Sequence, residues 1–158
     1  MLANEESQRA VEDSTKLGRT LGFLRLLLAV DHALDTRSKR MQMRHGITAP
    51  QRFFLRIVGR FPGISAGEVA SIMEVHPSTL TGVLRRLQDR RWVQREDDKA
   101  DRRRSLLKLT TEGKRYDELR TGTVESAVKR ALARVSADDA DAAARVLSAV
   151  TLELQRED

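Results

Sequence analysis

Cysteine is absent from the 158 residues of this chain. Its absence excludes disulfides, thiolate metal sites and a cysteine-based redox switch. Long apolar runs are missing as well: residues 26–30 come closest, but Arg25 and Asp31 bound them, and a membrane span needs roughly 18 apolar residues. The N-terminus has no basic segment leading into an apolar core, so we expect no secretory signal and a cytoplasmic location.

The usual signatures of catalysis are also missing. The three histidines, His32, His45 and His76, are far apart in sequence, and none forms a metal-ligand spacing such as H-x-x-x-H. The chain has neither a G-x-S-x-G elbow nor a glycine-rich phosphate loop. We therefore expect no enzyme, no metal and no resident cofactor, with a histidine–carboxylate metal sensor at a dimer interface as a minor alternative.

What the chain does have is charge, and that charge is unevenly placed. Hydrophobic residues make up 40% and charged residues 33%, which excludes a disordered chain and a membrane protein. The net charge is +6, and residues 76–108 supply +5 of it with 10 basic and 5 acidic side chains. A basic surplus confined to one segment indicates a surface for a polyanion.

Apolar periodicity and helix-start signals predict a mostly helical chain. Leucines recur at helical spacing at Leu17, Leu21, Leu24 and Leu28. They predict a first helix from about Thr15 to about Met43. Capping boxes at 48–51 and 65–68 begin the next two helices, and His76 begins a third.

The second half of the chain predicts a hairpin and two more helices. A strand around 92–96, a turn over 97–101 and a returning strand to Leu109 come first. Thr110 or Thr111 caps a single helix with one apolar side, made of Tyr116, Leu119, Val128, Leu132 and Val135. Ser136 begins the last helix, whose seam is Ala140, Ala143, Leu147, Val150 and Leu154. The predicted order is four helices, two strands and two helices.

The second and third short helices, joined by the turn 73–76, match a helix-turn-helix, whose second helix enters a major groove. The candidate DNA-binding residues of this unit are Ser65, Ser78, Thr79, Thr81, Gly82, Arg85 and Arg86. Hydroxyls near a helix N-terminus can bind phosphate, and an arginine can contact guanine bidentately. A mid-helix glycine costs about 1 kcal/mol against alanine, so Gly82 indicates the close approach of another backbone or a ligand. The alternative is an ordinary amphipathic helix with a solvated polar face.

The predicted hairpin tip carries three consecutive arginines, Arg102, Arg103 and Arg104, preceded by Asp101. Such a run can contact phosphate or the minor groove of DNA; a solubilising tip is the alternative. The spacing D-x-R followed by L-T-x-x-G resembles the wing of the MarR family of winged-helix transcription regulators, and PSTLT at 77–81 resembles the start of that family's recognition helix. The resemblance covers roughly residues 15–156.

The resemblance implies that Arg103 enters the minor groove and that Asp101 holds the neighbouring arginines. The chain departs from the family at Arg90-Arg91-Trp92, where a glycine often ends the recognition helix. We therefore expect a different helix end there, with Arg91 as an additional phosphate contact.

The resemblance also implies a mostly α fold with a small β-wing, in which a winged helix-turn-helix core is flanked by N- and C-terminal dimerisation helices. The expected parts are a tail (1–14), a dimerisation helix (15–46), the DNA-binding lobe (47–112) and C-terminal dimerisation helices (113–158). The alternative is that both helix seams pack within their own chain. Many members of that family bind small aromatic or phenolic anions in a cleft between these parts. The candidate residues for such an effector cleft in this chain are Arg25, His32, Phe53, Phe54 and Arg56. The alternative is that the aromatic residues belong to the core and the arginines to the surface.

Two functions from different classes follow. The first is a sequence-specific regulator of transcription on double-stranded DNA, a ligand-responsive repressor that binds a near-palindromic operator as a homodimer. The second is a winged-helix module that coats DNA without sequence preference or docks onto another protein.

Overall fold

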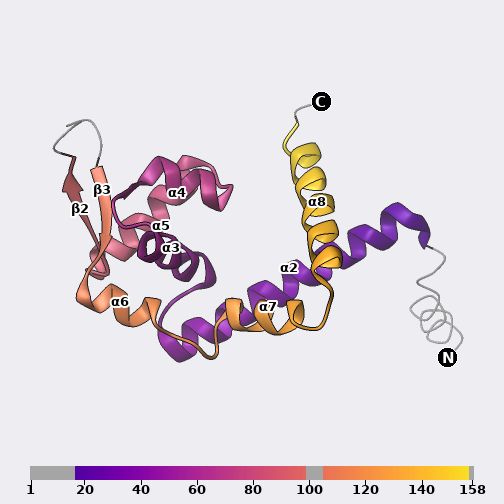
Figure 1. Cartoon of the computed structure of the whole chain (residues 1–158), viewed down its shortest axis with the longest axis horizontal. Helices are drawn as coiled ribbons and strands as arrows, with labels where there is room; N and C mark the ends of the chain where they lie inside the picture. Colours follow the sequence, from indigo (N-terminus) through magenta and orange to yellow (C-terminus); the bar gives the residue numbers. More distant parts are fainter. Residues whose placement is uncertain (1–16, 99–104, 157–158) are drawn as a thin grey trace, which may run out of the picture.

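The structure, a computed structural model, describes residues 17–98 and 105–156. Its elements are α2 (Gly18–His45), α3 (Ala49–Arg60), β1 (Ile64–Ser65), α4 (Ala66–Met73), α5 (Pro77–Asp89), β2 (Val93–Asp97), β3 (Ser105–Leu109), α6 (Thr111–Asp117), α7 (Val124–Leu132) and α8 (Ala137–Leu154). A lobe built from α3 to α6 lies on one side, and α2, α7 and α8 lie on the other (Figure 1). The predicted fold class, mostly helical with a small β-wing, is confirmed.

The helices of the lobe begin where the sequence predicts. The Thr48 hydroxyl accepts a hydrogen bond from the Gln51 amide while the Gln51 side chain accepts one from the Thr48 amide, so the first capping box closes. Ser65 and Glu68 form the second in the same way. Each box satisfies amide groups that a helix start would otherwise leave unpaired. α2 spans 18–45, close to the predicted 15–43, and ends at Gly46 with a φ of 71°.

Three antiparallel strands form the sheet, in the order β1-β3-β2. β2 and β3 are the predicted hairpin, with Asp97 opposite Ser105 in the last described pair, next to the connection between the two strands. β1 was not predicted because it is two residues long and overlaps the capping box of α4. The core of the lobe lies between this sheet and helices α3 to α5, and its largest buried side chains include Phe54, Leu55, Leu84, Leu87 and Leu107.

The prediction of one helix over residues 111–135 is wrong. α6 ends at Asp117, and α7 begins only at Val124, with Thr123 as its cap. Gly122 lies between them with a φ of 73°, a left-handed conformation that glycine adopts without strain. The break directs α6 against the lobe and α7 along α2 (Figure 1).

None of the helices that the structure describes is long and apolar enough to cross a membrane. Within the same residues, no group of three or more histidine, aspartate or glutamate side chains could hold a metal ion.

Candidate nucleic-acid interface

The helix-turn-helix consists of α4, a three-residue turn and α5. Glu74 makes the turn possible with a φ of 52°, and the His76 imidazole then caps α5 by accepting a hydrogen bond from the Ser78 amide. The inner face of α5 is buried through Leu80, Leu84 and Leu87. Because these three residues share one side of the helix, the opposite side is left for solvent or a partner.

The outer face of α5 carries six of the candidate DNA-binding residues, and all six are exposed: Ser78, Thr79, Thr81, Gly82, Arg85 and Arg86. The Thr81 hydroxyl donates to the Pro77 carbonyl over 2.9 Å, which fixes its position on the first turn. Neither Arg85 nor Arg86 has an ion pair with another described residue. Neither guanidinium group is therefore held by an acidic side chain of the described residues, from which it would have to separate before it binds a polyanion.

Ser65 lies apart from that face. It is on β1, opposite Leu106, and its hydroxyl donates to the Glu68 carboxylate over 2.7 Å. The structure thus places it in a helix cap beside the sheet, and a phosphate contact through it stays a prediction.

Gly82 is not packed against another described element. A Cβ atom added there would meet no described atom within 4 Å. Of the two reasons predicted for this glycine, approach of another backbone in the same chain is wrong for the described residues. Approach of a ligand, for which the open space leaves room, stays a prediction.

The end of α5 shows how this chain manages without the expected glycine. Arg91 adopts the left-handed conformation itself, with a φ of 57°. Its neighbour Arg90 donates to the Gly46 carbonyl, and the Arg90 guanidinium lies 4.8 Å from the centre of the Trp92 ring. Since a non-glycine residue in this conformation costs about 1–2 kcal/mol, these contacts of Arg90 offset strain at the helix end. Arg91 is exposed, and its predicted phosphate contact is untested.

The predicted wing tip falls in the part of the chain between β2 and β3. Asp101, Arg102, Arg103 and Arg104 lie outside the described residues. What the structure gives is the two strands of the wing, from the Val93–Leu109 pair to the Asp97–Ser105 pair beside the tip. The roles of the four residues therefore stay predictions.

The L-T-x-x-G motif joins the wing to α6. The Thr110 hydroxyl accepts from the Gly113 amide over 3.0 Å and donates to the Arg91 carbonyl over 2.6 Å. A Cβ atom on Gly113 would lie 2.0 Å from the Trp92 carbonyl oxygen. Only glycine therefore lets α6 pack this closely on the start of β2.

Replacing Gly113 tests that packing. We expect Gly113→Ala to lower the free energy of unfolding by about 3 kcal/mol, because the methyl group must displace backbone rather than a flexible side chain. The matched control is Gly82→Ala, which should raise the same quantity by about 1 kcal/mol because it adds helix propensity in open space. Urea denaturation of both variants measures the difference, and equal effects would contradict the close-packing account.

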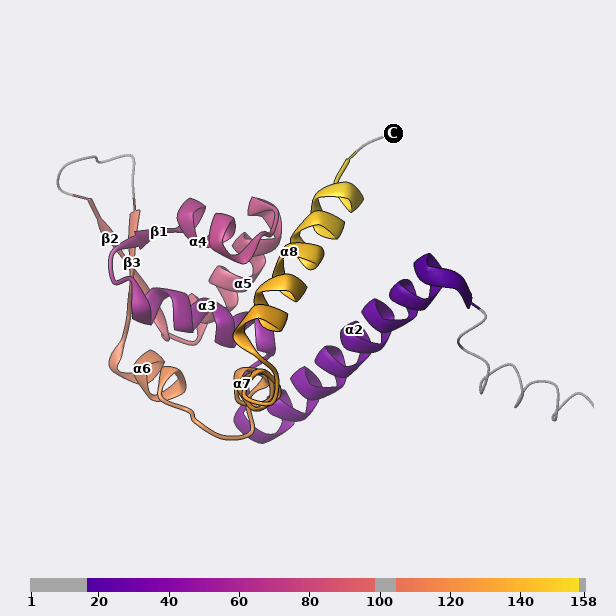
Figure 2. The same ribbon diagram turned by 45° about the vertical axis from the view of Figure 1, so that its right-hand side comes forward.

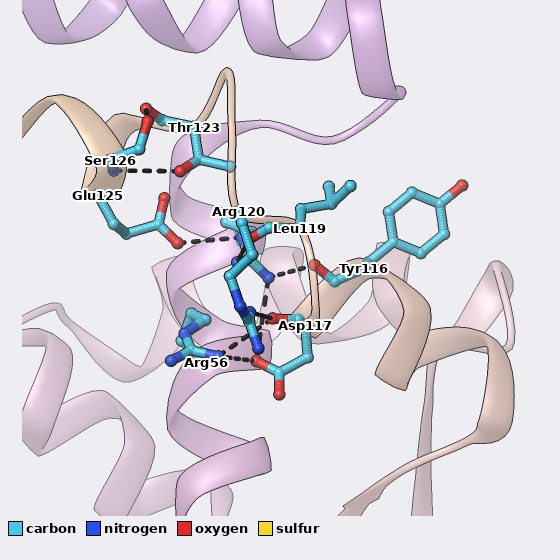
Figure 3. A network of polar contacts seen from close by, with 9 residues as sticks. Arg56, Tyr116, Asp117, Leu119, Arg120, Thr123, Glu125 and Ser126 are labelled. Carbon is cyan, nitrogen blue, oxygen red and sulfur yellow. Dashed lines mark hydrogen bonds and ion pairs between the residues drawn. The ribbon is translucent and has the colours of Figure 1, made fainter.

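A polar network around Arg52 joins the lobe to the terminal helices (Figure 3). Arg52, on the first turn of α3, is 2% exposed. It donates to the Tyr116 carbonyl and, over 2.8 Å, to the Leu119 carbonyl, and its Nε lies 3.0 Å from a Glu125 oxygen. Burial lowers the pKa of Arg52 below its ordinary value, and the Glu125 carboxylate acts in the opposite direction. One side chain therefore holds the end of α6 and the start of α7.

This network was not predicted. The available signal was an arginine three residues before Leu55, on the side of α3 that faces inward. A charge there needs partners, because an unpaired buried charge is costly. Its partners lie more than 60 residues away along the chain, so the sequence did not indicate them.

An open cavity of about 740 Å³ lies between the terminal helices and the lobe. It is mainly apolar, and its lining includes Leu34, Phe53, Met73, Val75, Val128 and Leu132. Of the five residues predicted for an effector cleft, the structure places only Phe53 in this cavity. Phe54 is buried in the core of the lobe, Arg25 and His32 are exposed elsewhere on α2, and Arg56 lines a second hollow. The structure does not bring the predicted set together.

Comparisons with known proteins agree on one family. Residues 45–104 match the model described as "MarR family". The transcriptional regulator HosA of Escherichia coli is 31% identical over 93 residues, which are 59% of this chain and 69% of HosA. The chain belongs to the MarR family. The HTH-type transcriptional repressor Rv2887 of Mycobacterium tuberculosis is 33% identical over 92 residues, 58% of this chain and 66% of its own length. Among solved structures, a MepR-like protein complexed with pseudoligands superposes with a TM-score of 0.69 at 25% identity, over 85% of this chain and 94% of its own.

Membership of the MarR family makes this chain one of a class of DNA-binding regulators of transcription, not an enzyme. The matched segment runs from the end of α2 through the helix-turn-helix to the wing. It contains the exposed face of α5 described above. The likeness of this chain to the family model therefore lies mainly in the lobe.

Proposed function

We propose that this MarR-family chain is a sequence-specific repressor that binds a near-palindromic operator as a homodimer and responds to a small ligand. The observation that carries the proposal is the outer face of α5, where hydroxyls lie on the first turns and two arginines, without an ion pair among the described residues, lie further along. Hydroxyls and the helix N-terminus suit phosphate, and arginine suits the edge of guanine. The name of Rv2887, a repressor, supports repression over activation.

Homodimerisation is supported by apolar faces that the described part of the chain leaves exposed. In α2 the exposed leucines include Leu21, Leu24, Leu28 and Leu34, and Leu17 directly precedes the helix; each is at least 41% exposed. In α8 no residue is buried, and Leu147 and Leu154 are exposed by 49% and 78%. α2 extends away from the lobe (Figure 2), whereas one side of α8, with Ser148, Thr151 and Leu152, lines a hollow beside α4. Within the described residues the seams are thus not packed on their own chain, and a second copy is the partner that supplies a matching pair of faces.

Ligand response is supported by the 740 Å³ cavity, which is of a size that small ligands occupy. Its walls come from α2 and α7 on one side and from α3 and α4 on the other. A ligand seated there changes the angle between the terminal helices and the lobe, and so the spacing of two recognition helices in a dimer. The MepR-like relative was crystallised with pseudoligands, which agrees with such a site.

Arg85 tests the sequence-specific part of the proposal. We expect Arg85→Ala to relax the base preference at one position per half-site, at a cost of about 1–3 kcal/mol there. The measurement is operator affinity against a set of single-base variants at one fixed salt concentration. An equal loss on all sequences would instead support the alternative, a module that coats DNA without base readout.

A further inference from the structure

A second hollow, of about 560 Å³, lies where α3, the α6–α7 connection and α7 meet. We propose that it binds a small oxyanion carrying several negative charges, a polycarboxylate or a phosphorylated metabolite. The charged side chains that line it are Arg52, Arg56, Arg120, Lys129, Arg130 and Glu125. Five cations thus share one hollow with one carboxylate.

The carboxylates nearby do not neutralise this cluster. Glu125 pairs with Arg52 over 3.0 Å, and Asp117 pairs with Arg56 over 2.8 Å. Arg120 donates one hydrogen bond to the Asp117 backbone carbonyl, which carries no charge. In Figure 3 the Arg56 and Arg120 side chains both reach toward Asp117, so their guanidinium groups lie close together.

Two further cations complete the surplus. Lys129 and Arg130 are exposed on α7 and have no ion pair with any residue that the structure describes. Of the residues that the structure describes, five cations against two carboxylates leave an excess of three positive charges around this hollow. Like charges held this close repel one another, and an anion with several charges relieves that repulsion while it accepts charge-assisted hydrogen bonds.

DNA is not the polyanion that this hollow fits. In both views the wing and α4 lie along the upper edge of the molecule, and the α6–α7 connection lies along the lower edge (Figures 1 and 2). A duplex held by α5 and the wing leaves it open. The volume also suits a small molecule, since ligand sites commonly enclose about 300–1,000 Å³.

The position of the hollow lets a bound anion affect the contacts between α3, α6 and α7. Glu125 and Lys129 line both the hollow and the apolar cavity. An anion beside Arg52 competes with Glu125 for that guanidinium, which also holds the carbonyls of Tyr116 and Leu119. Occupation of the hollow therefore acts on the side chain that joins α3 to α6 and α7.

Calorimetric titration of the full chain, without DNA, tests the site. The probes are citrate, inorganic phosphate and acetate at constant ionic strength, and we expect saturable binding of citrate or phosphate at one site per chain, with acetate much weaker. Tighter binding of citrate would identify polycarboxylates as the class, and tighter binding of phosphate would identify phosphorylated compounds. Because no DNA is present, failure here is distinct from failure of the proposed repressor function.

Paired variants give the control. Arg130→Gln and Lys129→Gln, each made as a single variant, should lower the affinity for the tighter-binding probe by about tenfold. That factor corresponds to the loss of one charge-assisted hydrogen bond. Arg134→Gln removes the same charge outside the hollow and should change the affinity less than twofold. Circular dichroism establishes that each variant is folded. The site does not exist if neither citrate nor phosphate binds more tightly than acetate, or if Arg134→Gln weakens binding as much as the other two variants.

Discussion

Raising the salt concentration from 50 to 200 mM is expected to weaken operator binding by about 10³–10⁵-fold. The physical reason is that each phosphate neutralised releases condensed counterions, so affinity falls as a steep power of salt concentration. Residues 76–108 carry 10 basic side chains, and the structure places Arg85, Arg86 and Arg91 among them on exposed positions. The range corresponds to roughly six to ten phosphates neutralised by a dimer. Fluorescence anisotropy over a series of salt concentrations measures the slope.

A pair of substitutions identifies the surface responsible. Arg86→Gln on α5 should reduce the slope of log affinity against log salt by about 1 for each phosphate contact removed. Arg134→Gln changes the net charge equally, but at the turn before α8, and should leave the slope unchanged. If both variants change the slope alike, or if affinity is nearly independent of salt, the basic segment is not the binding face.

Loss of the α2 seam is expected to abolish dimerisation and to weaken operator binding by about 10²–10⁴-fold, since two linked half-site contacts become one. Leu24→Glu combined with Leu28→Glu places two carboxylates where 46% and 61% exposed leucines lie in the single chain. Burying a leucine stabilises an interface by about 2 kcal/mol, whereas burying an unpaired carboxylate opposes it. Deleting residues 1–30 should have the same effect. Analytical ultracentrifugation reports the mass, and anisotropy reports the affinity.

The control for the seam is Arg19→Glu. Position 19 precedes Leu21 by two residues and so lies on the other side of α2, where it is exposed. This variant should stay dimeric. Its operator affinity should change by no more than about threefold, the effect of replacing one positive by one negative charge at the surface. A double leucine variant that sediments as a dimer with full affinity would show that the partner covers another face.

The sequence predicted those features that depend on neighbouring residues. Each of the helices α3, α4, α5 and α8 begins at a residue whose side chain accepts a hydrogen bond from a backbone amide two or three residues later. These capping residues are Thr48, Ser65, His76 and Ser136. The exposed polar face of α5 follows from the spacing of the polar residues between Ser78 and Arg86. Both properties depend on residues that are close together along the chain, so a single sequence is sufficient to predict them.

The features that were missed depend on distant parts of the chain. Residues 111–135 were predicted as one helix because their apolar residues recur at helical spacing across the break between α6 and α7. In the structure Leu119 packs on the core, whereas Val128 is exposed. The partners of Arg52 lie on elements more than 60 residues away. The predicted effector cleft failed to assemble for the same reason: Arg25, His32 and Arg56 have suitable chemistry, but α2 and α3 direct them away from the cavity that Phe53 lines.

A footprint on the DNA beside the chain's own gene tests the central claim most directly. The protein as a homodimer should protect one discrete, near-palindromic stretch, with half-site centres about 10 bp apart, one turn of the duplex. Arg85→Ala should still protect this stretch at higher protein concentration, with reduced discrimination against operator variants. Even protection along the whole fragment, with no boundary at any concentration, would contradict sequence-specific regulation and leave the DNA-coating module as the function of this chain.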